Sequence, residues 1–212
     1  ASSGAQLATA SISNGEATVS APIGASAFVN VQAPGYLLYD GSQETKTIEA
    51  TTFFFVTLTT RTANNSLSTK ISTFDENRAK ASATIAILAY NNPLNVLAEQ
   101  ESDGELSVDL APGSYYVSAR APVRHTATGF VEAGSSLDLI LRRQTPANTA
   151  NLNLTVFDEE YNLLSEADGL VYLIKDGRNI FIEPSKKTNS FGQAGFALEK
   201  GREYGISVNY LG

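Results

Sequence analysis

The 212-residue chain contains no cysteine, methionine or tryptophan, and it has a single histidine. Without cysteine it can form no disulfide and no thiolate metal site, and it has no cysteine nucleophile. No Gly-x-Ser-x-Gly motif accompanies His125, so we predict a surface-loop histidine after Pro122 rather than a catalytic one. Zinc-ligand spacings, glycine-rich phosphate loops and dinucleotide-binding fingerprints are also missing. The sequence therefore predicts no enzyme, no cofactor and no metal.

Long apolar runs and excess positive charge are missing as well. The stretch Phe53-Phe54-Phe55-Val56 is only strand-sized, and no apolar run approaches the roughly 20 residues that span a bilayer. Fifteen basic residues against 22 acidic ones give a net charge of −7. An acidic surface repels phosphate backbones. We expect neither a membrane span nor a nucleic-acid partner.

An internal repeat organises the sequence. Each copy has a glycine followed by Glu or Gln, and a second glycine nine residues after the first. Turn residues precede the first glycine, which is a strong hairpin signal. The copies begin 89 and 88 residues apart, so the chain is expected to contain three related units. The glycine pairs are Gly15 and Gly24, Gly104 and Gly113, and Gly192 and Gly201.

Apolar and polar residues alternate after the second glycine of each copy. This period of two is typical of half-buried antiparallel strands, and no long segment has the 3.6-residue period of a helix. The pattern predicts an all-β fold of tandem Ig-like or transthyretin-like antiparallel β-sandwich repeats. The alternating residues are Ala27, Val29 and Val31, then Tyr115, Val117 and Ala119, then Tyr204, Ile206, Val208 and Tyr210.

The order of these features resembles a known type of module. An Asp-Gly or Asn-Gly turn, an apolar hairpin, an Ala-Pro-Gly-like turn and an alternating strand precede Ala33-Pro34-Gly35-Tyr36. This order is similar to carboxypeptidase regulatory-like and collagen-adhesin B-type domains, which are transthyretin-like β-sandwiches. The resemblance implies an extracellular module of stalks, pili or enzyme appendages, usually without catalysis of its own. The small residues at the start of the chain would suit a signal-peptidase cut, which agrees with secretion.

The repeat also predicts domain boundaries. A polar connector that contributes an extra strand is expected between the first and second units. The first unit is expected to lack its leading strand, and the third to lack its closing strand. The predicted ranges are 1–61 for unit 1, 62–77 for the connector, 78–143 for unit 2 and 144–212 for unit 3.

Particular strands follow from this frame. Leading strands are expected at 82–90 and 152–157, and closing strands at 48–59 and 136–142. A sheet edge left open beside an uncovered core is a template for a further strand.

We therefore predict that copies join head to tail by β-strand donation. An extended N-terminal segment of one subunit would complete unit 3 of the next. Such a heterologous contact does not close on itself and gives a filament, pilus-like thread or stalk at the cell surface. Donor candidates are Ala5, Leu7, Ala10 and Ile12, and acceptor candidates are Tyr204, Ile206, Val208 and Tyr210.

Two other functions stay open at this point. The chain could be an adhesive or carbohydrate-binding module with cell-surface or glycan ligands, which predicts an exposed aromatic patch. It could instead supply accessory domains of a larger secreted enzyme. Two sequons make Asn64 and Asn153 candidate glycosylation sites of a secreted glycoprotein. The acidic run Asp158-Glu159-Glu160 is expected to be a solvated turn, with a weak calcium site as the alternative.

Overall fold

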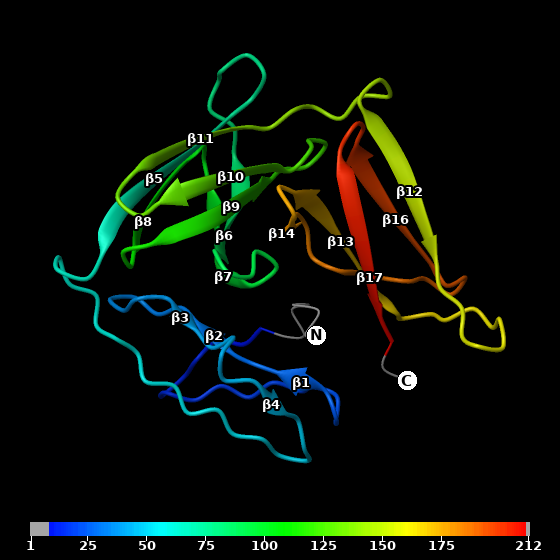
Figure 1. The fold of residues 1–212 in the computed structure, drawn as a ribbon, viewed down its shortest axis with the longest axis horizontal. Coiled ribbons are helices and arrows are strands. Elements are labelled where there is room, and N and C mark those ends of the chain that lie inside the picture. Colours follow the sequence, from blue (N-terminus) through cyan, green and yellow to red (C-terminus); the bar gives the residue numbers. More distant parts are fainter. Residues whose placement is uncertain (1–8, 211–212) are drawn as a thin grey trace.

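The computed structural model describes residues 9–210, and every regular element in that range is a β-strand. The predicted all-β class is confirmed. No helix in this part of the chain is long and apolar enough to cross a membrane. The strands form three groups: short ones near the N-terminus, a sandwich in the middle of the chain and a second layered group after it (Figure 1).

The middle group is a seven-stranded sandwich. One sheet has the order β10-β9-β6-β7 and the other has the order β11-β5-β8. β11 runs parallel to β5, and the other neighbours are antiparallel. The strands are β5 (Leu67–Phe74), β6 (Ala83–Ala89), β7 (Val96–Ser102), β8 (Glu105–Leu110), β9 (Ser114–Arg120), β10 (Ala127–Glu132) and β11 (Ser136–Ile140).

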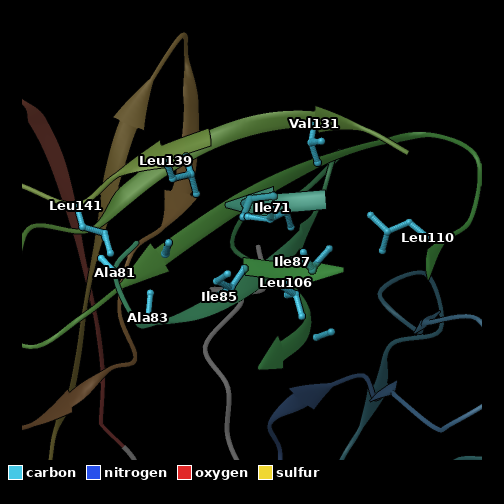
Figure 2. Packing of buried hydrophobic residues seen from close by; sticks show 13 residues of the cluster. Ile71, Ala81, Ala83, Ile85, Ile87, Leu106, Leu110, Val131, Leu139 and Leu141 are labelled. Atoms are coloured by element: carbon cyan, nitrogen blue, oxygen red, sulfur yellow. The ribbon is translucent and has the colours of Figure 1, made fainter. Parts of the chain in front are cut away.

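The alternating residues of these strands close a core between the two sheets. Ile71 of β5 and Leu139 of β11 in one sheet and Ile85 and Ile87 of β6 in the other are almost completely buried and belong to one core cluster (Figure 2). Burying each such side chain stabilises the fold by about 1.5–3 kcal/mol. This sandwich is therefore complete within the chain.

The C-terminal group has the same layers with fewer strands. β12 pairs with β16 in one sheet, while β13 in the other sheet has β14 and β15 on one edge and β17 on the other. A second apolar cluster fills the space between them. The strands are β12 (Thr149–Thr155), β13 (Asp168–Lys175), β14 (Arg178–Phe181), β15 (Lys186–Lys187), β16 (Gln193–Glu199) and β17 (Glu203–Asn209).

The two groups pack side by side. Ala86 and Leu88 lie on the outer face of β6 and belong to the second apolar cluster, with Tyr116 packed against it. The backbone N–H of Phe181 donates to the carbonyl of Pro93 at 3.0 Å. Part of the outer face of the β10-β9-β6-β7 sheet is therefore covered by the C-terminal group.

The N-terminal group is much less regular. It contains four strands of two residues each, and no hydrophobic side chain between residues 9 and 61 is among the buried ones. The closing strand predicted at 48–59 is wrong for this structure, because residues 52–59 pair with no strand. A strand is stable only when it pairs with another strand, and the described residues before 61 contain no strand long enough to pair with residues 52–59. The four strands are β1 (Ser26–Ala27), β2 (Asn30–Val31), β3 (Tyr39–Asp40) and β4 (Lys46–Thr47).

The expected connector contains a central strand. β5 falls within 62–77 and lies between β8 and β11, with Thr69 and Thr73 fully buried. The domain boundaries themselves stay a prediction. The repeated turns agree with the repeat, since Gly15, Gly104 and Gly192 have φ of 82°, 98° and 63°. These left-handed values favour glycine.

Candidate assembly surface

The middle sandwich shows what a complete edge looks like. Its β9 is flanked by β6 and β10, and its inward residues Val117 and Ala119 are each 0% exposed. Val131 of β10 and Leu139 of β11 belong to the same core cluster. The strands that follow β9 in sequence therefore seal the sandwich at this side.

The C-terminal group lacks that seal within the described residues. β17 occupies the place of β9: Ile206 lies opposite Val171 of β13, as Val117 lies opposite Ile87 of β6. Ile206 is 44% exposed and Val208 is 42% exposed, although their counterparts in the middle sandwich are fully buried. An apolar strip along an open edge strand is a site for a further strand.

The second sheet of this group is open too. β12 pairs with β16 on one side, and no strand among residues 9–210 pairs with its other side. Figure 1 shows β12 as an outermost strand of the C-terminal group. Leu152 and Leu154 point toward the second core and are only half-buried. Each sheet of the group thus has a free edge strand among the described residues, β12 in one and β17 in the other.

The residues around the β16–β17 turn are already paired. Arg142 and Arg202 contact the Glu199 carboxylate at 3.0 and 3.2 Å. The Tyr204 hydroxyl donates to the Glu199 carbonyl at 3.3 Å, and burial raises the pKa of Tyr204. This end of β17 is fixed, and the open apolar strip begins at Ile206.

The predicted acceptor residues therefore lie together on β17 and just after it. Tyr204 is half-buried in the second cluster, and Tyr210 is 46% exposed beyond Val208. The acceptor role stays a prediction. Ala5 and Leu7, two of the predicted donors, lie outside the described residues. Ala10 and Ile12 are exposed.

The glycosylation and calcium candidates are placed as follows. Asn64 and Asn153 are both exposed, and Asn153 stands on the outer face of β12. The Asp158 carboxylate accepts hydrogen bonds from the side chain and backbone of Asn162 and from the backbone of Glu160, which lower its pKa. Asp158 thus orders its own loop. Among residues 9–210 no group of three or more potential metal ligands is found.

His125 is not a surface-loop residue, and that prediction is wrong. It is 4% exposed, and its Nε2 lies 3.1 Å from Asn148 Oδ1 and 3.1 Å from Thr149 Oγ1. The segment between the two groups folds back over it, which the sequence does not reveal. His125 and Arg124 line a cleft of about 630 Å³ between the groups.

An exposed aromatic patch lies near the same junction. Tyr90 stacks on Tyr116 with ring centroids 6.0 Å apart, and Phe130 meets both rings edge-on. The guanidinium of Arg178 lies 4.6 Å from the Tyr90 ring centroid. Tyr90 and Phe130 are 40% and 45% exposed.

The reasoning from sequence missed the open edge of β12. A signal was present: Phe74-Asp75-Glu76 recurs 83 residues later as Phe157-Asp158-Glu159. In both places the Phe forms an isolated bridge, and the Asp side chain accepts backbone N–H groups of the following turn. This second repeat aligns β12 with β5, the strand with which β11 pairs in the middle sandwich.

Comparisons with known proteins find partial structural likenesses. No protein-family model matches the chain, and no curated protein matches its sequence. A Streptococcal ancillary pilin is similar over 84% of this chain and 63% of its own, at 12% identity and TM-score 0.30. The shaft pilin SpaA of Lactobacillus rhamnosus GG is similar over 68% of this chain and 88% of its own, at 11% identity and TM-score 0.28.

A third likeness is to the Bacillus anthracis TIE protein, at 19% identity and TM-score 0.28. It covers 68% of this chain but only 28% of that protein. The chain therefore spans a minor part of the TIE protein and less than two thirds of the ancillary pilin.

Proposed function

We propose that the chain is a structural, non-enzymatic subunit of an extracellular filament, pilus-like thread or stalk. Copies join head to tail by β-strand donation onto the C-terminal group. The sandwiches are of the carboxypeptidase regulatory-like or collagen-adhesin B-type kind, in line with the motif order around Ala33-Pro34-Gly35-Tyr36. The observation that carries the proposal is the contrast between β9 and β17: the same inward positions are fully buried in one and more than 40% exposed in the other.

The acceptor is the open edge of β17. A strand added there would gain main-chain hydrogen bonds along the edge and would cover Ile206, Val208 and Tyr210. The donor we infer is the N-terminal segment around Leu7 and Ile12. Donor and acceptor are different surfaces. Any assembly would therefore keep a free donor at one end and a free acceptor at the other, and it would continue to grow into a filament.

Sedimentation and electron microscopy of the purified chain test this function. We expect filaments or concentration-dependent oligomers from the intact chain, and soluble monomers after deletion of residues 1–12. A chain that stays monomeric at every accessible concentration would overturn the proposal. Filaments that persist after the deletion would leave self-assembly standing and remove the N-terminal donor.

A second candidate function is sugar binding at the aromatic patch of Tyr90, Tyr116 and Phe130. Exposed tyrosine and phenylalanine rings offer the flat apolar faces on which sugars stack. Here Arg178 already covers one ring, at 4.6 Å from its centroid. Binding of the unsubstituted chain to glycans on an array, together with loss of that binding in Tyr90→Ala, would favour this function over a purely structural one.

A further inference from the structure

Residues 52–60 form an extended segment that pairs with no strand. Side chains alternate along it: Phe53 and Phe55 are 66% and 85% exposed, whereas Phe54, Val56 and Leu58 are half-buried. The segment is rich in β-branched and aromatic residues, which favour strands. Within the described chain its only bridge joins Thr60 to Tyr36. It has the composition and the alternation of a strand without a sheet.

The C-terminal end of this segment is held in the same way as the end of β11. The backbone N–H of Leu37 donates to Thr59, and that of Arg61 donates to Gly35, each at 2.8–2.9 Å. In the middle sandwich His125 donates to Arg142 and Gln144 donates to Val123 in the same pattern. The bridge between Tyr36 and Thr60 likewise matches the one between Arg124 and Arg143.

These matches align the segment with β11 residue by residue. A constant offset of 83 relates Thr60 to Arg143, so Phe54, Val56 and Leu58 correspond to Leu137, Leu139 and Leu141. Leu139 and Leu141 are 4% and 0% exposed and belong to the core of the middle sandwich. The unpaired segment thus carries the three inward apolar residues that a closing strand needs.

The same offset identifies the strand that lacks such a partner. Ile71 of β5 lies opposite Leu106 of β8, and Leu154 of β12 lies opposite Ala194 of β16. β12 thus corresponds to β5 at the offset of 83, while β16 corresponds to β8 at an offset of 88, and the two strand pairs keep the same register. In the middle sandwich β11 lies parallel to β5, with Leu137 opposite Ile71. The corresponding place beside β12 is free among the described residues.

We propose that residues 52–60 of a second copy of this chain add to the free edge of β12 as a parallel strand and seal the second core. The inference rests on the proposed self-assembly and names a donor for the sheet opposite β17. The pairing of β11 with β5 fixes the register. It places Phe54 opposite Leu154, Phe55 opposite Thr155 and Val56 opposite Val156.

A second copy fits this role better than the same chain does. The segment is anchored near the middle sandwich, where Arg61 contacts Asp109 of β8 at 3.5 Å. It lies on the opposite side of the molecule from β12 (Figure 1). Only six residues separate Thr60 from the start of β5, and this length spans at most about 20–25 Å. A contact between copies is heterologous and continues the head-to-tail chain.

Cysteine cross-linking tests the register directly, because the chain has no native cysteine. One full-length chain carries Phe55→Cys and a second carries Thr155→Cys. The two are mixed under mild oxidation, and the disulfide-linked peptide that joins positions 55 and 155 is quantified by mass spectrometry. Directly opposed residues bring Cα atoms within the range of about 4.4–6.8 Å that a disulfide needs. The matched control pairs Thr57→Cys with Thr155→Cys, on the same face but two residues out of register.

We expect the in-register pair to cross-link at least about tenfold more than the control, since two residues displace the thiols by roughly 6–7 Å. Equal or absent cross-linking would overturn the inference. Electron microscopy of the same mixtures separates the two claims. Assembly without the link between positions 55 and 155 removes only this donor, whereas a chain that never assembles removes the proposed function as well.

Discussion

The open edge of the second core makes a prediction about two matched valines. Val171 of β13 and Val208 of β17 lie on the inward face of the same sheet, and both can be changed to alanine. Val171 is 0% exposed, and Val208 is 42% exposed. The two substitutions remove the same atoms, so any difference in their cost reports how well each site is covered.

The expected sizes follow from burial. Each Val→Ala change removes the equivalent of two methylene groups, or about 1.6 kcal/mol of transfer free energy when fully buried. At Val171 a cavity term adds to this, giving roughly 2–3 kcal/mol. At Val208 a little under three fifths of the side chain is buried and solvent can fill the gap, so we expect about 1 kcal/mol or less.

Urea unfolding at low protein concentration, followed by a probe in the C-terminal group, measures both changes. The Val208→Ala variant should also weaken self-association, because the proposed donor strand would cover this side chain. Equal destabilisation by the two substitutions in the dilute monomer would refute the reasoning, since it would mean that β17 is covered within its own chain.

Two further predictions concern the middle sandwich. Glu105 contacts Lys70 at 2.7 Å and Lys80 at 2.6 Å, and their hydrogen bonds lower its pKa to about 2. The ionised Glu105 therefore stabilises the fold above the unfolded pKa of about 4.3, and this stabilisation is lost as pH falls toward 2. Glu105→Gln should make the thermal midpoint decline less steeply between these pH values. An unchanged decline of the midpoint in acid would contradict this. His125→Ala should lower the free energy of unfolding by about 1–3 kcal/mol, because it removes a buried side chain and its hydrogen bonds to the half-buried Asn148 and Thr149. The exposed control Val123→Ala should stay within about 0.5 kcal/mol of the parent in urea titrations, and a similar value for His125→Ala would count against the buried contact.

The sequence predicted the parts of this fold that depend on local chemistry. Gly104 and Gly192 lie in turns with left-handed φ, as the turn residues before them and the repeated spacing of nine residues between glycines indicated. Leu152 and Leu154 point toward a core, on the segment where a leading strand was expected. Turn geometry and alternation are properties of a few neighbouring residues, so one sequence suffices to find them.

The missed features depend on distant partners. β5 is polar in sequence, yet its threonines are buried because strands from far along the chain flank it on both sides. Residues 53–56 have the composition of a strand but pair with no strand among the described residues. The closing strand expected there was therefore wrong, because strand propensity does not show whether a partner strand is available. His125 is buried by Asn148 and Thr149, which lie more than 20 residues away.

Hydrogen exchange measured against protein concentration tests most directly whether another copy completes the C-terminal group. The amides of β12 and β17 that point away from β16 and β13 have no strand to pair with among residues 9–210 of a single chain. We predict fast exchange of these amides in the dilute monomer and strong protection as the concentration rises, with little change in β6 and β9, which are interior strands of their sheet. Rates at the two free edges that do not change with concentration while oligomers form would contradict strand donation at these edges.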